Sequence, residues 1–191
     1  MSTTRSFVAI ELADEVRDVL TDVRASILDE DPTWRGEKWV APENLHLTLK
    51  FLGNLEEAPL ARMRSEIGLA LADAEPCAIS FADLKAVPSA RRSSMIWARF
   101  SDLDGGCARL AERVEQATIA AGAEPARRPF ALHVTLVRAR RPRHLDPTAL
   151  THASTKAACR SGLMSVPRAT LFASTLTRTG PIYETIESWQ L

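Results

Sequence analysis

The sequence predicts an α+β fold made of two similar halves. The pattern Leu-His-x-Thr-Leu occurs twice, at residues 45–49 and 132–136, which indicates an internal repeat. Each copy ends the same order of predicted elements: a strand, a helix, and then the strand that carries the pattern. No linker rich in Pro, Gly or Ser separates the two parts. We therefore expect residues 1–191 to form a single two-lobed domain.

The elements of the first half follow from hydrophobic periodicity and from turn residues. Apolar residues spaced three and four apart predict helices, and short apolar runs bounded by Gly, Pro or Asn predict strands. The expected elements are a strand over 5–12, a helix from an N-cap at Asp14 to Ile27, a loop bounded by Pro32 and Gly36, the motif strand over 45–52, a helix over 56–73, and paired strands over 77–87 and 94–100.

The second half repeats this order and then extends it. Its expected elements are a strand over 95–100, a helix over 104–121, a loop over 122–129, the motif strand over 132–137, and two final strands over 163–177 and 182–189. Residues 138–162 contain two prolines and scattered polar residues, so we expect mostly loop there, with a short helix from Pro147.

Composition excludes several classes of protein. The 24 basic and 24 acidic residues give a formal net charge of zero, whereas a protein that coats duplex nucleic acid is usually basic. No apolar run is long enough to span a membrane, and the first residues lack the pattern of a signal peptide. The three widely spaced cysteines indicate free thiols in a reducing compartment. We expect a cytoplasmic monomer with no membrane contact and no obligate protein partner.

The two motifs place polar side chains on one face of each strand. Successive residues of a strand point to opposite faces, so the leucines of each motif should pack against a helix. The residues predicted to face away from that core are His46, Thr48 and Lys50 in the first copy, and His133, Thr135 and Val137 in the second.

Two imidazoles and two hydroxyls that converge on one cleft suit phosphoester cleavage. One imidazole can take a proton from the attacking water while the other gives a proton to the departing oxygen. The hydroxyls of Thr48 and Thr135 can donate to non-bridging phosphate oxygens. Because His46 and His133 supply both proton transfers, we expect no metal and no cofactor.

Longer stretches around the motifs resemble a known family. They are the opening Arg5-Ser6-Phe7-Val8-Ala9-Ile10, the run from Asn44 to Gly53, the Arg128-Pro129-Phe130 before the second motif, the late Leu171-Phe172-Ala173-Ser174, Tyr183, and the closing Trp189-Gln190-Leu191. Over nearly its whole length the chain resembles the two-histidine (2H) phosphoesterase superfamily, and within it the RNA 2′,3′-cyclic phosphodiesterases, historically called 2′–5′ RNA ligases.

The resemblance implies a fold and a reaction. The fold is two pseudo-symmetric lobes, each an antiparallel sheet backed by helices, with the motifs flanking a central active-site groove. The reaction is hydrolysis of a 2′,3′-cyclic phosphate, at an RNA 3′ end or on a nucleotide, to a 2′-phosphate. His46 would be the general acid on the leaving 3′ oxygen and His133 the general base on water, while Thr48 and Thr135 would bind the phosphate.

Five further residues are candidate substrate contacts. Arg128 suits a phosphate, Phe130 suits stacking on a base, and Lys50 shares the predicted face of the first histidine. Arg92 lies in a predicted turn beside a second arginine, and Tyr183 suits either stacking or the core. We expect the other side chains singled out to be structural or solvated, with Phe51 in the core and Arg138, Arg140, Arg141, Arg143, His144 and His152 at the surface.

Two departures from the family pattern and three alternative functions remain. Leu132 stands where a proline usually precedes the second histidine, and it should still fill a core position. Residues 144–162 match nothing in the pattern. The alternatives are 2′–5′ ligation of tRNA halves by the same site in reverse, a non-catalytic module that binds RNA ends, and a metallohydrolase. The last would need further ligands, because no carboxylate or cysteine lies at ligand spacing beside either histidine.

Overall fold

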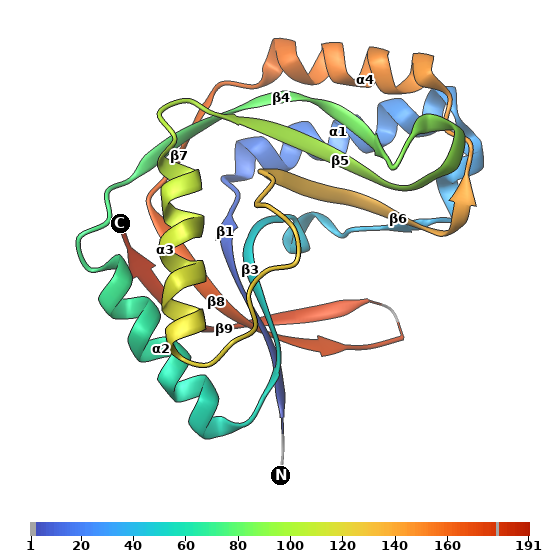
Figure 1. The fold of residues 1–191 in the computed structure, drawn as a ribbon. Helices are drawn as coiled ribbons and strands as arrows, with labels where there is room; N and C mark the ends of the chain where they lie inside the picture. The colour runs from blue at the N-terminus through green and yellow to red at the C-terminus, as the bar shows by residue number, and fades with distance from the viewer. Residues whose placement is uncertain (1–2, 179) are drawn as a thin grey trace.

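A computed structural model describes residues 3–178 and 180–191 of the chain (Figure 1). The strands are β1 (Thr4–Glu11), β2 (Lys38–Trp39), β3 (His46–Leu55), β4 (Cys77–Val87), β5 (Ser93–Asp102), β6 (His133–Arg143), β7 (Leu163–Val166), β8 (Arg168–Leu176) and β9 (Pro181–Gln190). The helices are α1 (Asp14–Glu30), α2 (Glu57–Leu71), α3 (Gly106–Ala120) and α4 (Pro147–Arg160), with short 3₁₀ turns at Pro32–Gly36, Pro42–Asn44 and Ala90–Arg92.

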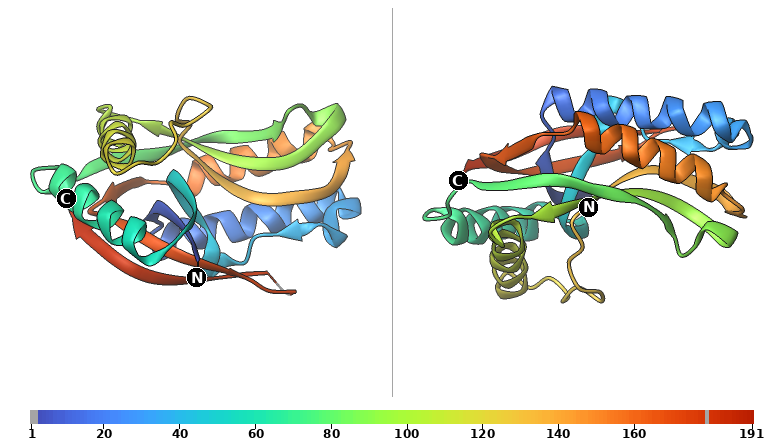
Figure 2. Two further views of the ribbon diagram at one scale, coloured as in Figure 1. Left: turned by 60° about the horizontal axis from the view of Figure 1, so that its bottom comes forward. Right: turned by 90° about the horizontal axis from the view of Figure 1, so that it is seen from above.

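The described strands form one antiparallel sheet in the order β7-β4-β5-β6-β3-β1-β8-β9, with β2 paired to β6. The sheet is curled, and its two halves run from β7 to β6 and from β3 to β9 (Figure 2). In each half the motif strand is innermost, and its outer neighbour is a strand that precedes it in the chain by one long helix, as β5 is to β6 and β1 is to β3. The predicted α+β fold with two similar antiparallel halves is confirmed. The halves meet where β3 pairs with β6, at Leu47 and Val134.

The helices pack in two pairs that mix the halves of the sequence. Helix α1 lies beside α4, and α2 lies beside α3 (Figures 1 and 2). On α1 the predicted apolar face is buried at Val19, Leu20, Val23 and Ile27. The predicted N-cap at Asp14 is wrong by one residue: the cap position holds Ala13, which makes no side-chain cap bond.

The region predicted to be mostly loop is largely regular. Strand β6 continues to Arg143, and a full helix, α4, follows it. Pro147 opens this helix, and the Asp146 carboxylate caps it by accepting a hydrogen bond from the Thr148 amide at 2.8 Å. The buried face of α4 consists of alanines, namely Ala149, Ala153 and Ala157. Because alanine is only weakly hydrophobic, this face gives a weak periodic pattern in the sequence. The small alanine side chains let α4 pack closely on α1.

The predicted strand over 163–177 is two strands that serve different halves of the sheet. Strand β7 pairs with β4, whereas β8 pairs with β1 and β9. Pro167 separates them, because proline lacks the N–H that a ladder needs. The three cysteines are free, as predicted. In the part of the chain that the structure describes, no helix has both the length and the apolar character needed to cross a membrane.

Candidate active site

The two motifs lie on adjoining strands in the middle of the sheet. Leu47 of β3 pairs with Val134 of β6, and both side chains are fully buried on the helix side. Extending this antiparallel register by one residue in each direction places His46 opposite Thr135 and Thr48 opposite His133. The four predicted side chains therefore share one face of the sheet at the line where its halves meet.

Each motif strand contains a β-bulge at its last leucine. In the ladder of β1 with β3, Ala9 pairs with Thr48 and Val8 with Lys50, so Leu49 is skipped. In the ladder of β5 with β6, Trp97 pairs with Thr135 and Ile96 with Val137, so Leu136 is skipped. An extra residue reverses the alternation of side chains beyond it. The residues that follow each bulge therefore lie on the opposite face from the one that simple alternation predicts.

The bulges overturn two predictions in the first motif. Lys50 is only 5% exposed and lies on the helix side, where its Nζ is 2.7 Å from Oε2 of Glu115 and donates to the carbonyl of Glu124 at 2.8 Å. It does not share the face of His46. Phe51, predicted to be core, is 61% exposed, and its ring centroid lies 6.0 Å from that of Phe7.

The second bulge brings Arg138 to the site. Val137, predicted to face away from the core, is buried, and Arg138 is exposed on the histidine face. The positive charge of Arg138 lowers the pKa values of His46, His133 and Tyr183. Arg138 was predicted only as a solvated residue. The signal that could have identified it is its position, because it stands five residues after its histidine, as Phe51 does in the first motif.

Both histidines are held in the same tautomer. The Nδ1 atom of His46 lies 2.7 Å from the carbonyl oxygen of Asn44, and Nδ1 of His133 lies 2.6 Å from that of Ala131. A carbonyl oxygen can only accept, so each Nδ1 carries the hydrogen. The nitrogen left for chemistry is therefore Nε2 in both rings, where a neutral imidazole has a lone pair and a protonated one has a hydrogen.

Aromatic side chains support each imidazole differently. Phe7 lies 4.8 Å from the ring centroid of His46, and Tyr183 meets the same imidazole edge-on at 5.3 Å. Trp97 stacks on His133 with centroids 3.8 Å apart and ring planes 28° apart. Tyr183, a predicted candidate, thus lies at the histidine cluster. Phe7 and Trp97 are not among the predicted site residues. Each lies on a strand that precedes its motif strand in the chain, with one long helix between the two strands.

Burial sets the electrostatics of the pair. Burial lowers the pKa of His46 and of His133, the hydrogen bond to the backbone carbonyl raises each in part, and Arg138 lowers both again. A charge on His133 lowers the pKa of His46 further. Both pKa values therefore lie below the ordinary value of histidine. Burial also raises the pKa of Tyr183 against the opposing charges of Arg138 and Arg5.

The remaining predicted contacts lie outside this cluster or at its rim. Arg128 and Phe130 are exposed in the segment that joins α3 to β6. Arg92 directly precedes Ser93, which pairs with Arg143. Arg143 ends β6, and about 30 Å of strand separates it from His133 at the start of that strand. The structure therefore does not bring Arg92 to the histidines. Leu132 packs against the core as predicted.

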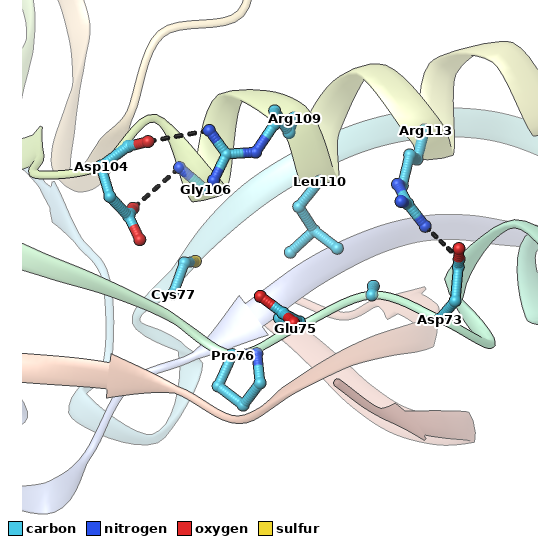
Figure 3. Close-up of a pocket in the computed structure, with 10 residues that line it drawn as sticks. Asp73, Glu75, Pro76, Cys77, Asp104, Gly106, Arg109, Leu110 and Arg113 are labelled. Carbon is cyan, nitrogen blue, oxygen red and sulfur yellow. Dashed lines mark hydrogen bonds and ion pairs between the residues drawn. The ribbon is translucent and has the colours of Figure 1, made fainter.

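A hollow of about 310 Å³ lies away from the histidines, between the start of β4 and the first turns of α3. Figure 3 shows that its two arginines are already engaged: Arg113 pairs with Asp73, and Arg109 donates to the carbonyl of Asp104 at 2.8 Å. None of the motif residues lines it. Across the described residues, His, Cys, Asp and Glu side chains nowhere gather in groups of three or more that could hold a metal ion.

Comparison with known proteins identifies the family. The family model described as "LigT like Phosphoesterase" matches residues 10–97 and 101–183. The chain belongs to the LigT-like phosphoesterase family. This confirms the resemblance to the two-histidine phosphoesterases that the motifs indicated.

Relatives of this LigT-like chain cover its whole length. A protein of Methanothermobacter thermautotrophicus named RNA 2′,3′-cyclic phosphodiesterase is 30% identical, with 98% of each chain covered. One of Aquifex aeolicus with the same name is 28% identical, over 100% of this chain and 99% of the relative. Among solved structures, TT0787 of Thermus thermophilus superposes with a TM-score of 0.77 at 27% identity, covering 98% and 97% of the two chains. Escherichia coli LigT complexed with 3′-AMP gives 0.75 at 23% identity, covering 100% and 99%, and supports the fold.

Proposed function

We propose that this protein hydrolyses 2′,3′-cyclic phosphates at RNA 3′ ends to 2′-phosphomonoesters, with a pair of histidines as acid and base and without a metal. The observation that carries the proposal is the matched tautomer of His46 and His133, which leaves one Nε2 on each adjoining strand free for proton transfer. The names of its full-length relatives support the substrate class, and the 3′-AMP complex of LigT supports a nucleotide-sized ligand.

The proposed reaction is a single displacement at phosphorus. Nε2 of neutral His133 takes a proton from water as the water oxygen bonds to phosphorus. The bond between phosphorus and the 3′ oxygen breaks, and Nε2 of protonated His46 gives its proton to that oxygen. The products are a 2′-phosphomonoester and a 3′-hydroxyl. Thr48, Thr135 and Arg138 would hold the non-bridging oxygens, where negative charge grows in the transition state.

Phe51 gives the site an exposed aromatic surface beside the first motif. Its ring stands next to Phe7, which in turn supports His46. Aromatic side chains bind unstacked nucleobases by their faces. We therefore assign Phe51, rather than Phe130, as the side chain on which the terminal base would stack.

The first experiment incubates the purified protein with a nucleoside 2′,3′-cyclic phosphate, with and without EDTA, and identifies the product. We expect turnover that survives EDTA and gives the 2′-phosphate. His46→Ala and His133→Ala should each lose about 10²- to 10⁴-fold in kcat. Loss of turnover on chelation would favour the metallohydrolase alternative, and a protein that binds the substrate without turnover would be the non-catalytic module. Wild-type turnover in both alanine variants would refute the histidine mechanism.

A second experiment assigns the roles of the two histidines. A substrate with sulfur at the bridging 3′ position has a leaving group that departs without protonation. With this substrate the defect of His46→Ala should shrink, while the defect of His133→Ala should persist. The opposite pattern would exchange the acid and the base.

A further inference from the structure

The histidine face of the sheet continues from β6 onto β5. Directly paired residues of antiparallel strands lie on the same face. The register of these strands places Arg99 opposite His133 and Trp97 opposite Thr135. The alternate residues of β5 are buried on the helix side. Arg99 is therefore the immediate neighbour of the second catalytic histidine in its row across the sheet.

The same rows reach β4, the next strand outward. Asp83 lies opposite Arg99, and Lys85 lies opposite Trp97. Leu84 between them is buried on the helix side, which fixes the two charged side chains on the histidine face. Lys85 is exposed, and no described residue forms an ion pair with it.

Arg99 keeps donors free although it is paired. Its Nε and Nη2 donate to the two carboxylate oxygens of Asp83, an arrangement that raises the pKa of Arg99. A guanidinium has five N–H groups, so three remain for another acceptor. The pair also holds the guanidinium plane in a fixed orientation on this face.

Two more cations lie on the second motif strand and on β2, its neighbour on the other side. Lys38 of β2 pairs with Arg138 of β6, and both are exposed. These neighbouring strands therefore place four cationic side chains and one carboxylate on the histidine face. They are Lys38, Arg138, Arg99 and Lys85, with Asp83; we call this set the cationic face.

The first half of the sheet offers a different surface to the same histidines. There Phe7 contacts Phe51, Phe172 and Tyr183, with ring centroids 6.0, 5.3 and 4.9 Å away. The two flanks of the site are thus chemically distinct, one aromatic and one cationic. A terminal base fits the aromatic flank, and a run of phosphates fits the cationic one.

We infer that the cationic face binds the phosphodiester backbone of the single-stranded RNA that leads to the cyclic phosphate. The inference rests on the proposed function and assigns the side chains that hold the RNA chain beyond its reacting end. Strands β5 and β4 lie about 5 and 10 Å from β6, so Arg99 and Lys85 stand at successive steps away from the reacting phosphorus. Each can hold a backbone phosphate further from the reacting end of the chain.

The test compares an oligoribonucleotide that ends in a 2′,3′-cyclic phosphate with the corresponding nucleoside 2′,3′-cyclic phosphate. In the wild type, kcat/KM should be higher for the oligonucleotide and should fall with added salt, by a slope of about 0.7 log units per log unit of salt for each phosphate held. Lys85→Glu should lower the ratio of oligonucleotide to mononucleotide kcat/KM by about 10-fold or more and should flatten the salt dependence. Arg99→Gln should act in the same direction.

Arg62→Glu is the matched control. Arg62 is exposed on α2, which packs against α3. Helix α3 lies on the side of the sheet away from the histidines, where its Glu115 contacts Lys50. The substitution makes the same change in charge as Lys85→Glu. It should leave both substrates unaffected. The inference is overturned if Lys85→Glu and Arg62→Glu give the same substrate ratio as the wild type. Failure of the proposed function is distinguishable, because the wild type would then turn over neither substrate.

Discussion

At the scale of single residues, two nearly identical motifs acquire different surroundings. Each histidine donates its Nδ1 hydrogen to the carbonyl two residues before it, so the tautomer follows from the local chain. The neighbours that distinguish the two rings come from elsewhere in the sequence: Tyr183 meets His46, whereas Trp97 stacks on His133. The motif therefore predicts the chemistry of the site, and only the fold shows how acid and base can differ.

The lowered pKa values of both histidines predict an acid-shifted pH profile. The proposed reaction needs one protonated and one neutral imidazole, and kcat/KM reports the free enzyme. Its maximum should therefore lie below about pH 6.5, the ordinary pKa of histidine. Arg138→Gln removes a positive charge that lowers both pKa values, so both limbs of the profile should move to higher pH. Arg62→Gln should leave them in place.

Arg138→Gln should also lower kcat/KM by about 10-fold or more, because the proposed charge-assisted hydrogen bond to phosphate would be lost. The two readouts separate its roles. A slower enzyme with unshifted limbs would mean that Arg138 binds phosphate without setting the histidine pKa values. If neither the pH profile nor kcat/KM changed, Arg138 would have no role in the reaction.

At the scale of elements, the bulges decide which side chains reach the site. Alternation correctly predicts the faces of the motif residues up to Leu49 and Leu136, and it fails immediately after them. A bulge is a property of two paired strands, and its position depends on partners far away in the sequence. This is why Lys50 was expected beside His46 and why Arg138 was expected only in solvent. Helix α4 is under-predicted for a related reason, since its alanine face is buried only where it packs on α1 and β4.

The contact between β3 and α3 gives a prediction at this scale. Burial raises the pKa of Glu115, but hydrogen bonds from Lys50 and from the Ala126 amide lower it by more, so the pKa lies below its ordinary value. Lys50 and Glu115 therefore form an ion pair. Glu115→Gln leaves a buried ammonium without its counter-charge and should destabilise the protein by about 3 kcal/mol. Lys50→Met removes that ammonium and leaves a carboxylate that water can reach, so about 1 kcal/mol or less should be lost.

Urea unfolding of both variants measures these differences. Activity provides the second comparison, because Lys50 lies on the helix side of the sheet and not at the phosphate. Lys50→Met should therefore keep kcat/KM for a cyclic mononucleotide within several-fold of the wild type. A loss of about 100-fold in kcat/KM by a folded Lys50→Met variant would show that Lys50 acts at the phosphate after all.

At the scale of the whole molecule, the active site exists because two halves share one sheet. The repeat was sufficient to predict an α+β fold with two similar lobes, since each half repeats the same order of elements. It could not show that the lobes join through β3 and β6, because this contact links residues 47 and 134 and depends on no local pattern. Nor could it show that α1 packs on α4 and α2 on α3. Each helix pair takes one helix from each half of the sequence. Neither half therefore has a complete core of its own.

The pairing of Leu47 with Val134 should therefore matter more for catalysis than its contribution to stability suggests. Leu47→Ala opens a cavity at the line where the halves meet and should cost about 2 to 5 kcal/mol. Leu20→Ala makes the same truncation in the buried face of α1, outside the two motif strands, and should cost a similar amount. Displacement of catalytic groups by about 1 Å can cost about 100-fold in rate. Measured well below both unfolding midpoints, Leu47→Ala should thus lose at least about 10-fold in kcat while Leu20→Ala stays near the wild type. Equal activity in two variants of equal stability would show that the spacing of the motifs is set elsewhere, by the ladders of β1 with β3 and of β5 with β6.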